Sequence, residues 1–276
     1  MTSESRREKA DRLRRLIRPL ERAAVAFSGG VDSTLLLAVC LEVLGSENVL
    51  ALSMTSPLVP EAERARAVEL AARLGADHCV VPFQALELPE VVSNAPERCY
   101  HCKKALFSSL FEVGKDHGYE VFLRGANADD AGDFRPGMKA GAELGVRAPL
   151  LEAGITKDEV RAFSRDLGLP TWDLPSMACL ASRIPYGTPL TAEALQRVEA
   201  AERAVRDRLD LGQLRVRDHF PIARIEVPSH DIECLSRQGV RGDVVEALQA
   251  LGYQYVTLDL QGFRSGSLNE GLDLKG

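Results

Sequence analysis

The chain has 276 residues, of which 45% are hydrophobic and 27% are charged, a balance typical of a globular protein with one large or two modest domains. Its formal net charge of −6 argues against a nucleic-acid binder, because such proteins usually carry a basic excess. The sequence has no run of about eighteen apolar residues, and residues 1–19 are too charged for a signal peptide, so we expect no membrane span and a cytoplasmic location.

Strand and helix patterns alternate through the first part of the chain. The predicted strands are 23–27, 48–54, 77–83 and 119–125, and the predicted helices are 32–44, 60–75, 100–117 and 156–168. The charged residues before the first strand are expected to form a surface helix. Because strands that alternate with helices at this spacing form parallel sheets, we expect an α/β fold whose parallel sheet is covered on both faces.

The second part of the chain follows a stretch rich in glycine, proline and aspartate at 168–189, which indicates a long loop or linker. A helical pattern over 191–210, short strands in QLRVRD and ARIEV, two helical runs and a strand at 253–260 predict a second, smaller α/β domain. We therefore place the first domain at 1–180 and the second, which we expect to bind substrate and to oligomerise, at 181–276.

The segment SGGVDS at 28–33 connects the first strand to the first helix. Glycines there let backbone N–H groups approach an anion, and the helix N-terminus favours negative charge, although a plain turn is the alternative. The segment is neither a Walker A loop nor a dinucleotide fingerprint. It resembles the PP-loop of the N-type ATP pyrophosphatases, which cleave ATP between its α and β phosphates. The resemblance implies that Ser28, Gly29, Gly30, Asp32 and Ser33 bind pyrophosphate and that Asp32 helps to hold Mg²⁺.

A polar loop, GANADDAGDFRPG, follows the fourth predicted strand. Ligands bind at the carboxyl ends of strands in open parallel sheets, so we expect Asn127, Asp129 and Asp130 to face the nucleotide site. A polar turn without such a role is the alternative.

The six cysteines are Cys40, Cys79, Cys99, Cys102, Cys179 and Cys234. Cys40, Cys79 and Cys234 lie in strand or helix patterns and are expected to pack as small core residues. Cys99 and Cys102 share one face of a helix start, and Cys179 lies in the loop after Trp172. A zinc site would need a fourth ligand, for which His101 is the neighbouring candidate, and a redox pair would leave Cys179 unexplained. Three thiolates also suit a [4Fe–4S] cluster with one iron left open for an extra sulfide.

Several longer segments together resemble the LarE family, ATP-dependent sulfur transferases of nickel-pincer nucleotide biosynthesis. They are AFSGGVDSTLL, RCYHCKKALF, LPTWDLPSMACLASRIPYGTPLT, LRVRDH and ARIEV, and with the polar loop they extend over nearly the whole chain. The resemblance implies that ATP adenylylates a carboxylate of pyridinium-3,5-biscarboxylic acid mononucleotide and that sulfur replaces AMP, giving a thiocarboxylate. It also implies a homo-oligomer, because the family often forms trimers or hexamers.

The family obtains its sulfur in two ways. Some members sacrifice the sulfur of a cysteine at the position of Cys179, and members with three cysteines carry an iron–sulfur cluster. With Cys99, Cys102 and Cys179, the chain resembles the second kind, which would receive sulfide or use another sulfur donor. We expect these cysteines to be catalytic, with Ser182 and Arg183 orienting the substrate near Cys179.

Two further sets of residues are candidates for substrate binding. Arg215 and Arg217 alternate along a predicted strand and therefore share a face, where two guanidinium groups can bind a phosphate. A solvated strand face is the alternative. Lys103 is expected to orient the substrate from another side, and Glu226 is either structural or metal-binding.

Two other functions remain open at this stage. A tRNA thiolase of the same superfamily would also use ATP and cysteines, but the acidic balance of the chain speaks against it. A non-catalytic adenine-nucleotide sensor would keep the loop without the chemistry, and the presence of Asp32 and three thiols argues against that.

Overall fold

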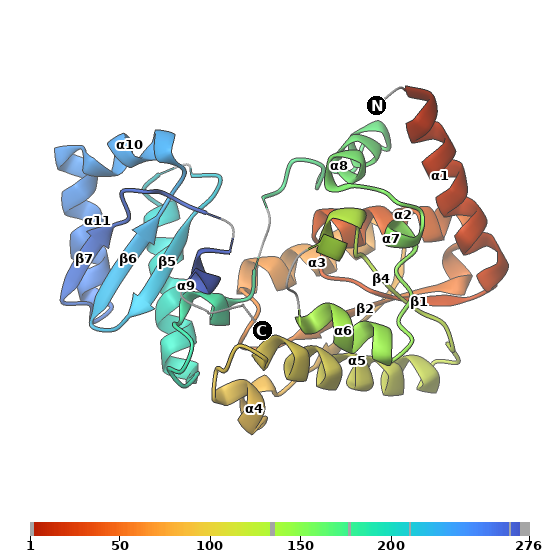
Figure 1. The fold of residues 1–276 in the computed structure, drawn as a ribbon, viewed down its shortest axis with the longest axis horizontal. Helices are drawn as coiled ribbons and strands as arrows, with labels where there is room; N and C mark the ends of the chain where they lie inside the picture. Colours follow the sequence, from red (N-terminus) through yellow and green to blue (C-terminus); the bar gives the residue numbers. More distant parts are fainter. Residues whose placement is uncertain (1–2, 133–135, 176–177, 210, 265, 271–276) are drawn as a thin grey trace. The chain divides into compact units, whose positions relative to one another are not determined.

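Two units, each built around its own β-sheet, make up the computed structural model, which describes residues 3–132, 136–175, 178–209, 211–264 and 266–270 (Figure 1). The first unit contains Met1–Gln84 and Cys99–Met177, and the second contains Ala85–Arg98 and Ala178–Gly276. This architecture confirms the predicted α/β fold with a second, smaller sheet. Among the described helices, none combines the length and the apolar character needed to cross a membrane.

The sheet of the first unit has four parallel strands, as the alternating pattern predicted. They are β1 (Ala23–Ala26), β2 (Val49–Thr55), β3 (Asp77–Pro82) and β4 (Phe122–Arg124), in the order β3-β2-β1-β4. The chain runs outward from β1 to β3 and then returns to the other side of β1 to form β4. The carboxyl ends of β1 and β4 therefore flank the topological switch point, where ligands bind in open α/β sheets.

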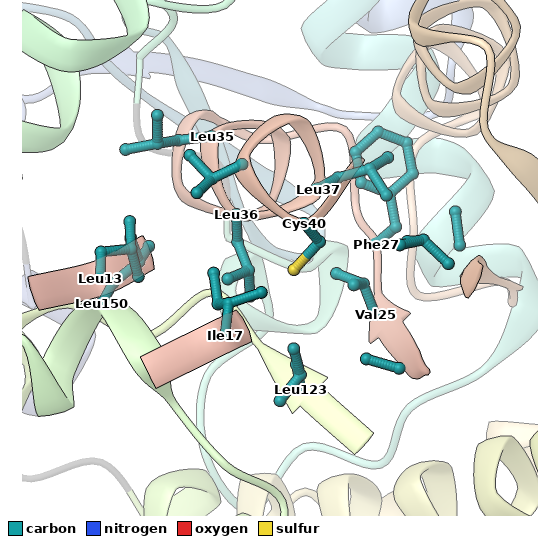
Figure 2. Packing of buried hydrophobic residues seen from close by; sticks show 14 of the residues in the cluster. Leu13, Ile17, Val25, Phe27, Leu35, Leu36, Leu37, Cys40, Leu123 and Leu150 are labelled. Atoms are coloured by element: carbon teal, nitrogen blue, oxygen red, sulfur yellow. The ribbon is translucent and has the colours of Figure 1, made fainter. Parts of the chain in front are cut away.

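Helices connect and cover these strands. They are α1 (Ser3–Ile17), α2 (Val31–Leu44), α3 (Glu61–Leu74), α5 (Arg98–Asp116), α6 (Pro136–Glu143), α7 (Pro149–Glu152) and α8 (Lys157–Asp166). Leu36 and Cys40 of α2 are fully buried in one cluster with Val25 and Leu123 of the sheet (Figure 2). Burial raises the pKa of Cys40 to about 12, so this thiol stays protonated and packs as an apolar side chain. The charged N-terminal segment forms a helix, as predicted, and buries Ile17 in the same cluster.

The second unit contains a three-stranded sheet in the order β5-β6-β7. Its helices and strands are α4 (Pro89–Val92), α9 (Ala192–Arg206), β5 (Arg215–His219), β6 (Ile222–Glu226), α10 (Ile232–Ser236), α11 (Gln238–Ala250) and β7 (Tyr255–Leu258). β5 and β6 are antiparallel, and β7 pairs with β6 in parallel. Apolar side chains from the sheet, α9 and α11, among them Val205, Val216, Ile225 and Leu248, form a separate core.

The segment Ala85–Arg98 belongs to the second unit, although most of that unit lies far along the chain. Asn94 explains this placement, because its side-chain amide donates to the carbonyls of Pro185 and Thr188 at 2.8 and 2.9 Å. No local pattern in the sequence points to these partners. The boundary between residues 180 and 181 stays a prediction of where the folding domains divide.

Candidate active site

The Ser-Gly-Gly-Val-Asp-Ser segment leaves β1 and enters α2 at the carboxyl edge of the sheet. Gly29 has φ +69°, and a Cβ atom there would lie 3.0 Å from the Cα atom of Ala67 in α3, so only glycine fits. Ser33 donates from Oγ to the carbonyl of Gly30 at 3.2 Å, and its Oγ lies 3.1 Å from Oγ of Ser28. The loop therefore places two hydroxyl groups beside the first turn of a 14-residue helix, an arrangement suited to phosphate.

Asp32, in the first turn of α2, is held by two side chains from other parts of the first unit. Asn127 donates from Nδ2 to Oδ1 of Asp32 at 2.9 Å. Nζ of Lys157 lies 2.5 Å from Oδ2, and the side chains of this ion pair are 29% and 20% exposed for Lys157 and Asp32. The carboxylate of Asp32, whose contact with Mg²⁺ stays a prediction, is thus fixed in place, and Lys157, which the sequence did not point to, lies beside it.

The turn after β4 uses its polar side chains to shape itself. The backbone N–H of Asp129 donates to Oδ1 of Asn127, and the backbone N–H of Asn127 donates to Oδ2 of Asp130, both at 3.0 Å. Asp129 also accepts from the backbone N–H of Lys157 at 2.7 Å. Asn127 therefore contacts the nucleotide loop through Asp32, while Asp129 and Asp130 hold the turn and the start of α8.

Lys157 is placed by the N-terminus of α8. The side chain of Thr156 accepts from the backbone of Glu159, whose carboxylate in turn accepts from the backbone of Thr156, so the helix begins with a capping box. Lys9 of α1 holds the same glutamate at 2.7 Å. The capping box is visible in the sequence as TKDE, but it does not reveal that Lys157 reaches Asp32, because that contact depends on the tertiary fold.

Cys99, Cys102 and Lys103 lie in the first turns of α5 in the first unit. Both cysteines are partly buried thiols, and Lys103 packs against α6, where a Cβ atom on Gly137 would lie 2.9 Å from its Cγ atom. Across the residues that the structure describes, no group of three or more His, Cys, Asp or Glu side chains could hold a metal ion. Cys179 belongs to the second unit, and the predicted cluster stays a prediction.

The segment around Cys179 is held through its main-chain carbonyls. Ser182 donates to the carbonyl of Cys179 from its backbone N–H at 3.0 Å and from Oγ at 2.8 Å. Arg183 donates from Nη1 to the same carbonyl at 3.0 Å and also to the carbonyl of Ala178. Its guanidinium is buried and binds both carboxylate oxygens of Glu202, at 2.8 and 3.0 Å. Ser182 and Arg183 thus orient the backbone of Cys179, and their contact with substrate stays a prediction.

Arg215 and Arg217 are buried in β5, with 6% and 5% of their surface exposed, so neither lies on a solvated strand face. Burial and then repulsion from Arg183 lower the pKa of Arg215 to about 10. Arg217 donates to one carboxylate oxygen of Glu226 at 2.6 Å, and Arg224 donates to the other at 3.0 Å. Glu226 is therefore engaged in structural ion pairs, while the lowered pKa of Arg215 follows first from its burial and then from the arginines near it.

A parallel sheet whose first strand ends in this loop, with an aspartate in the first helical turn, defines the first unit as a PP-loop domain of the N-type ATP pyrophosphatase class. The family model described as NAD synthase matches residues 12–98, which include the loop. GMP synthase from Aeropyrum pernix is 28% identical over 241 residues, which cover 80% of this chain and 45% of that protein.

Two relatives match nearly the full length of the chain. Pyridinium-3,5-bisthiocarboxylic acid mononucleotide synthase from Lactiplantibacillus plantarum is 41% identical over 256 residues, 93% of this chain and 92% of that protein. An uncharacterized protein from Synechocystis sp. is 43% identical over 265 residues, 96% of this chain and 98% of that protein. The chain belongs to the LarE family, to which the Lactiplantibacillus synthase belongs, and the predicted resemblance is confirmed.

Proposed function

We propose that the protein is an ATP-dependent sulfurtransferase that converts a carboxylate of pyridinium-3,5-biscarboxylic acid mononucleotide into a thiocarboxylate for nickel-pincer nucleotide synthesis. The observation that carries the proposal is the 41% identity to a bisthiocarboxylic acid mononucleotide synthase over 93% of the chain. The contacts of Asp32 with Asn127 and Lys157 support it, because they equip the loop for a phosphate ligand. Two rounds of reaction give the dithio product.

The first step activates the carboxylate. One of its oxygens attacks the α-phosphorus of ATP, and pyrophosphate leaves with the electron pair of the broken P–O bond. In this proposal the hydroxyl groups of Ser28 and Ser33 and the N-terminus of α2 bind this leaving group, and Lys157 adds a positive charge; the contact between the two hydroxyl groups and the ion pair of Lys157 with Asp32 support it. Asp32 is a suitable ligand for Mg²⁺ with the phosphate oxygens, and the bound ion would supply charge neutralisation.

The second step exchanges AMP for sulfur. A sulfur nucleophile attacks the activated carboxyl carbon, the C–O bond to AMP breaks, and AMP leaves with the electron pair. We propose that Cys99, Cys102 and Cys179 are thiolate ligands of a [4Fe–4S] cluster, which would supply an exchangeable sulfide. All three are thiols outside disulfides, which supports this donor set. In this cluster scheme, free sulfide or another donor replaces the sulfide after each turnover. The alternative is that Cys179 gives up its own sulfur.

The substrate also carries a phosphate, which we assign to Arg215 and Arg217, with Lys103 as a further orienting residue. The support is the placement of both arginines in one strand, β5, together with Arg183 near enough to Arg215 to affect its pKa, because guanidinium groups gathered in this way attract a phosphate. We further propose a cytoplasmic protein that acts as a homo-oligomer, a trimer or hexamer.

The test is anaerobic turnover of the full-length protein with ATP, Mg²⁺, sulfide and the biscarboxylic acid mononucleotide. Mass spectrometry should detect the thiocarboxylate, together with pyrophosphate and AMP that form only when the substrate is present. Asp32→Ala serves as the inactive comparison. ATP binding without pyrophosphate release would instead support a nucleotide sensor, and sulfur incorporation into bulk tRNA would support a tRNA thiolase.

A further inference from the structure

A buried arginine from a distant part of the sequence contacts the segment of Cys179. Arg98 is the last residue of the segment Ala85–Arg98, which belongs to the second unit, and 3% of its surface is exposed. It donates from Nη1 to the carbonyl of Ala181 at 3.1 Å and to the side-chain oxygen of Asn94. Its guanidinium carbon also lies 5.6 Å from the ring centre of Tyr186.

Asn94, which accepts a hydrogen bond from Arg98, is itself held firmly in place. Asn94 is fully buried and has φ +55°, a left-handed conformation that asparagine tolerates better than most residues. Its side chain donates to Pro185 and Thr188, and its own carbonyl accepts from the backbone N–H of Gly187 at 3.1 Å. The residues that follow Cys179 are therefore bound to Asn94, and Asn94 is bound to Arg98.

Three guanidinium groups bind four of the five main-chain carbonyls from Ala178 to Ser182. Arg183 binds those of Ala178 and Cys179, Arg98 binds that of Ala181, and Arg217 binds that of Ser182 at 2.7 Å. Burying three charges carries a large desolvation cost. Their use on one short stretch of backbone indicates that the position of that stretch matters. The cysteine at its centre stays partly accessible.

We propose that Arg98 is a positioning residue for Cys179, acting through the carbonyl of Ala181. This inference rests on the proposed function, in which the sulfur that Cys179 helps to hold, or in the alternative its own sulfur, must reach an adenylylated carboxylate before water does. Attack by water on the same carbon releases AMP and returns the original carboxylate, so ATP is consumed without product. A backbone held on both sides of Cys179 favours sulfur over water, because small displacements of a reacting group cost large factors in rate.

The first test compares Arg98→Ala and Arg98→Lys with Arg241→Ala, which removes an exposed arginine of α11 in the same unit. Pyrophosphate release should be unchanged in every variant, because the ATP loop lies in the first unit. Arg98→Ala should form about tenfold more AMP per thiocarboxylate than the wild type, given the sensitivity of rate to placement. Arg98→Lys should recover part of the loss, and Arg241→Ala should match the wild type.

The second test measures position without turnover. The full-length protein is treated with iodoacetamide under anaerobic conditions, and peptide mass spectrometry gives the alkylation rates of Cys179 and of Cys234 in α10. Loosening of the Cys179 segment in Arg98→Ala should raise the alkylation rate of Cys179 by about threefold or more. The alkylation rate of Cys234 should stay unchanged. Faster alkylation at both cysteines would assign Arg98 to general stability and overturn the proposal.

The failures of the two proposals are distinguishable. A wild-type protein that forms no thiocarboxylate would reject the proposed function, while the alkylation comparison would still test the placement of Cys179. A productive wild type with the same AMP per thiocarboxylate and the same alkylation ratio in Arg98→Ala would overturn the role of Arg98 alone.

Discussion

Replacing Glu202 with glutamine should destabilise the second unit, because it removes one charge from a buried ion pair. The side chains of Arg183 and Glu202 are 2% and 3% exposed, and their two contacts measure 2.8 and 3.0 Å. Removing one partner of such a pair costs about 3–5 kcal/mol. Glu202 also accepts from the backbone N–H of Val216 at 3.2 Å, a bond that the amide oxygen of glutamine can keep. We therefore expect a loss of about 3 kcal/mol, at the lower end of that range.

The assay is urea denaturation followed by circular dichroism, with hydrogen exchange of the β5 amides to assign the transition to the second unit. Glu193→Gln is the matched control, because Glu193 is exposed in the first turn of the same helix, α9. The control should stay within about 0.5 kcal/mol of the wild type. A loss below about 1 kcal/mol for Glu202→Gln would refute the inference that breaking the pair leaves the charge of Arg183 buried and uncompensated.

The same variant has a defined dependence on pH. Burial alone would raise the pKa of Glu202, but the pull of Arg183 and further arginines lowers it overall from the ordinary value of 4.5. A carboxylate with a lowered folded-state pKa stabilises the protein above the unfolded-state pKa and loses that contribution as pH falls through the folded-state value. The stability difference between wild type and Glu202→Gln should therefore be constant near neutral pH and shrink in acid. A difference that grows in acid would contradict the assigned direction.

Three further predictions concern the reaction. Asp32→Ala should bind substrate but fail to adenylylate it, as judged by pyrophosphate release, and normal adenylylation would remove Asp32 from the site. Arg215→Ala and Arg217→Ala should each weaken binding of the mononucleotide substrate by about 1.5–3 kcal/mol, as measured by calorimetry. Arg217→Ala should also lower the stability of the protein, because it removes one counter-charge from the buried Glu226. Unchanged affinity in both variants would assign the two arginines a structural role. Intact-protein mass after turnover should stay constant in the cluster scheme, whereas sacrifice of Cys179 would lower it by roughly 34 Da, the mass of H₂S lost when dehydroalanine forms.

Local chemical patterns predicted the first unit well. The alternation of strands and helices predicted a parallel sheet, and the glycine-rich turn predicted where its ligand edge lies, because both features depend on neighbours in sequence. Lys157 shows the limit of such patterns. The capping box around it predicts a helix start, but the 2.5 Å contact with Asp32 depends on how α8 packs near α2.

The second unit was harder to predict for a physical reason. Alternation along β5 indicated that Arg215 and Arg217 share a face but could not show that this face is buried, because burial depends on what covers the strand. Arg98 and Asn94 carried no local signal at all. The carbonyls of Ala181 and Thr188 that their side chains bind lie 83 and 94 residues away, and only the folded chain brings buried polar groups to the carbonyls that satisfy them.

The polar network of the second unit is best understood as a device for position rather than stability. Buried ion pairs are often no more stabilising than well-packed apolar residues, so stability alone does not explain why Arg98, Arg183 and Arg217 are all buried at the Cys179 segment. Apolar replacements could fill the same volume but could not bind carbonyl oxygens. The guanidinium groups fix the backbone on both sides of Cys179, and in the proposed reaction their positive charge would also attract a phosphate-bearing substrate. A single arrangement thus serves both demands of the proposed reaction, placement of the sulfur and binding of the anion.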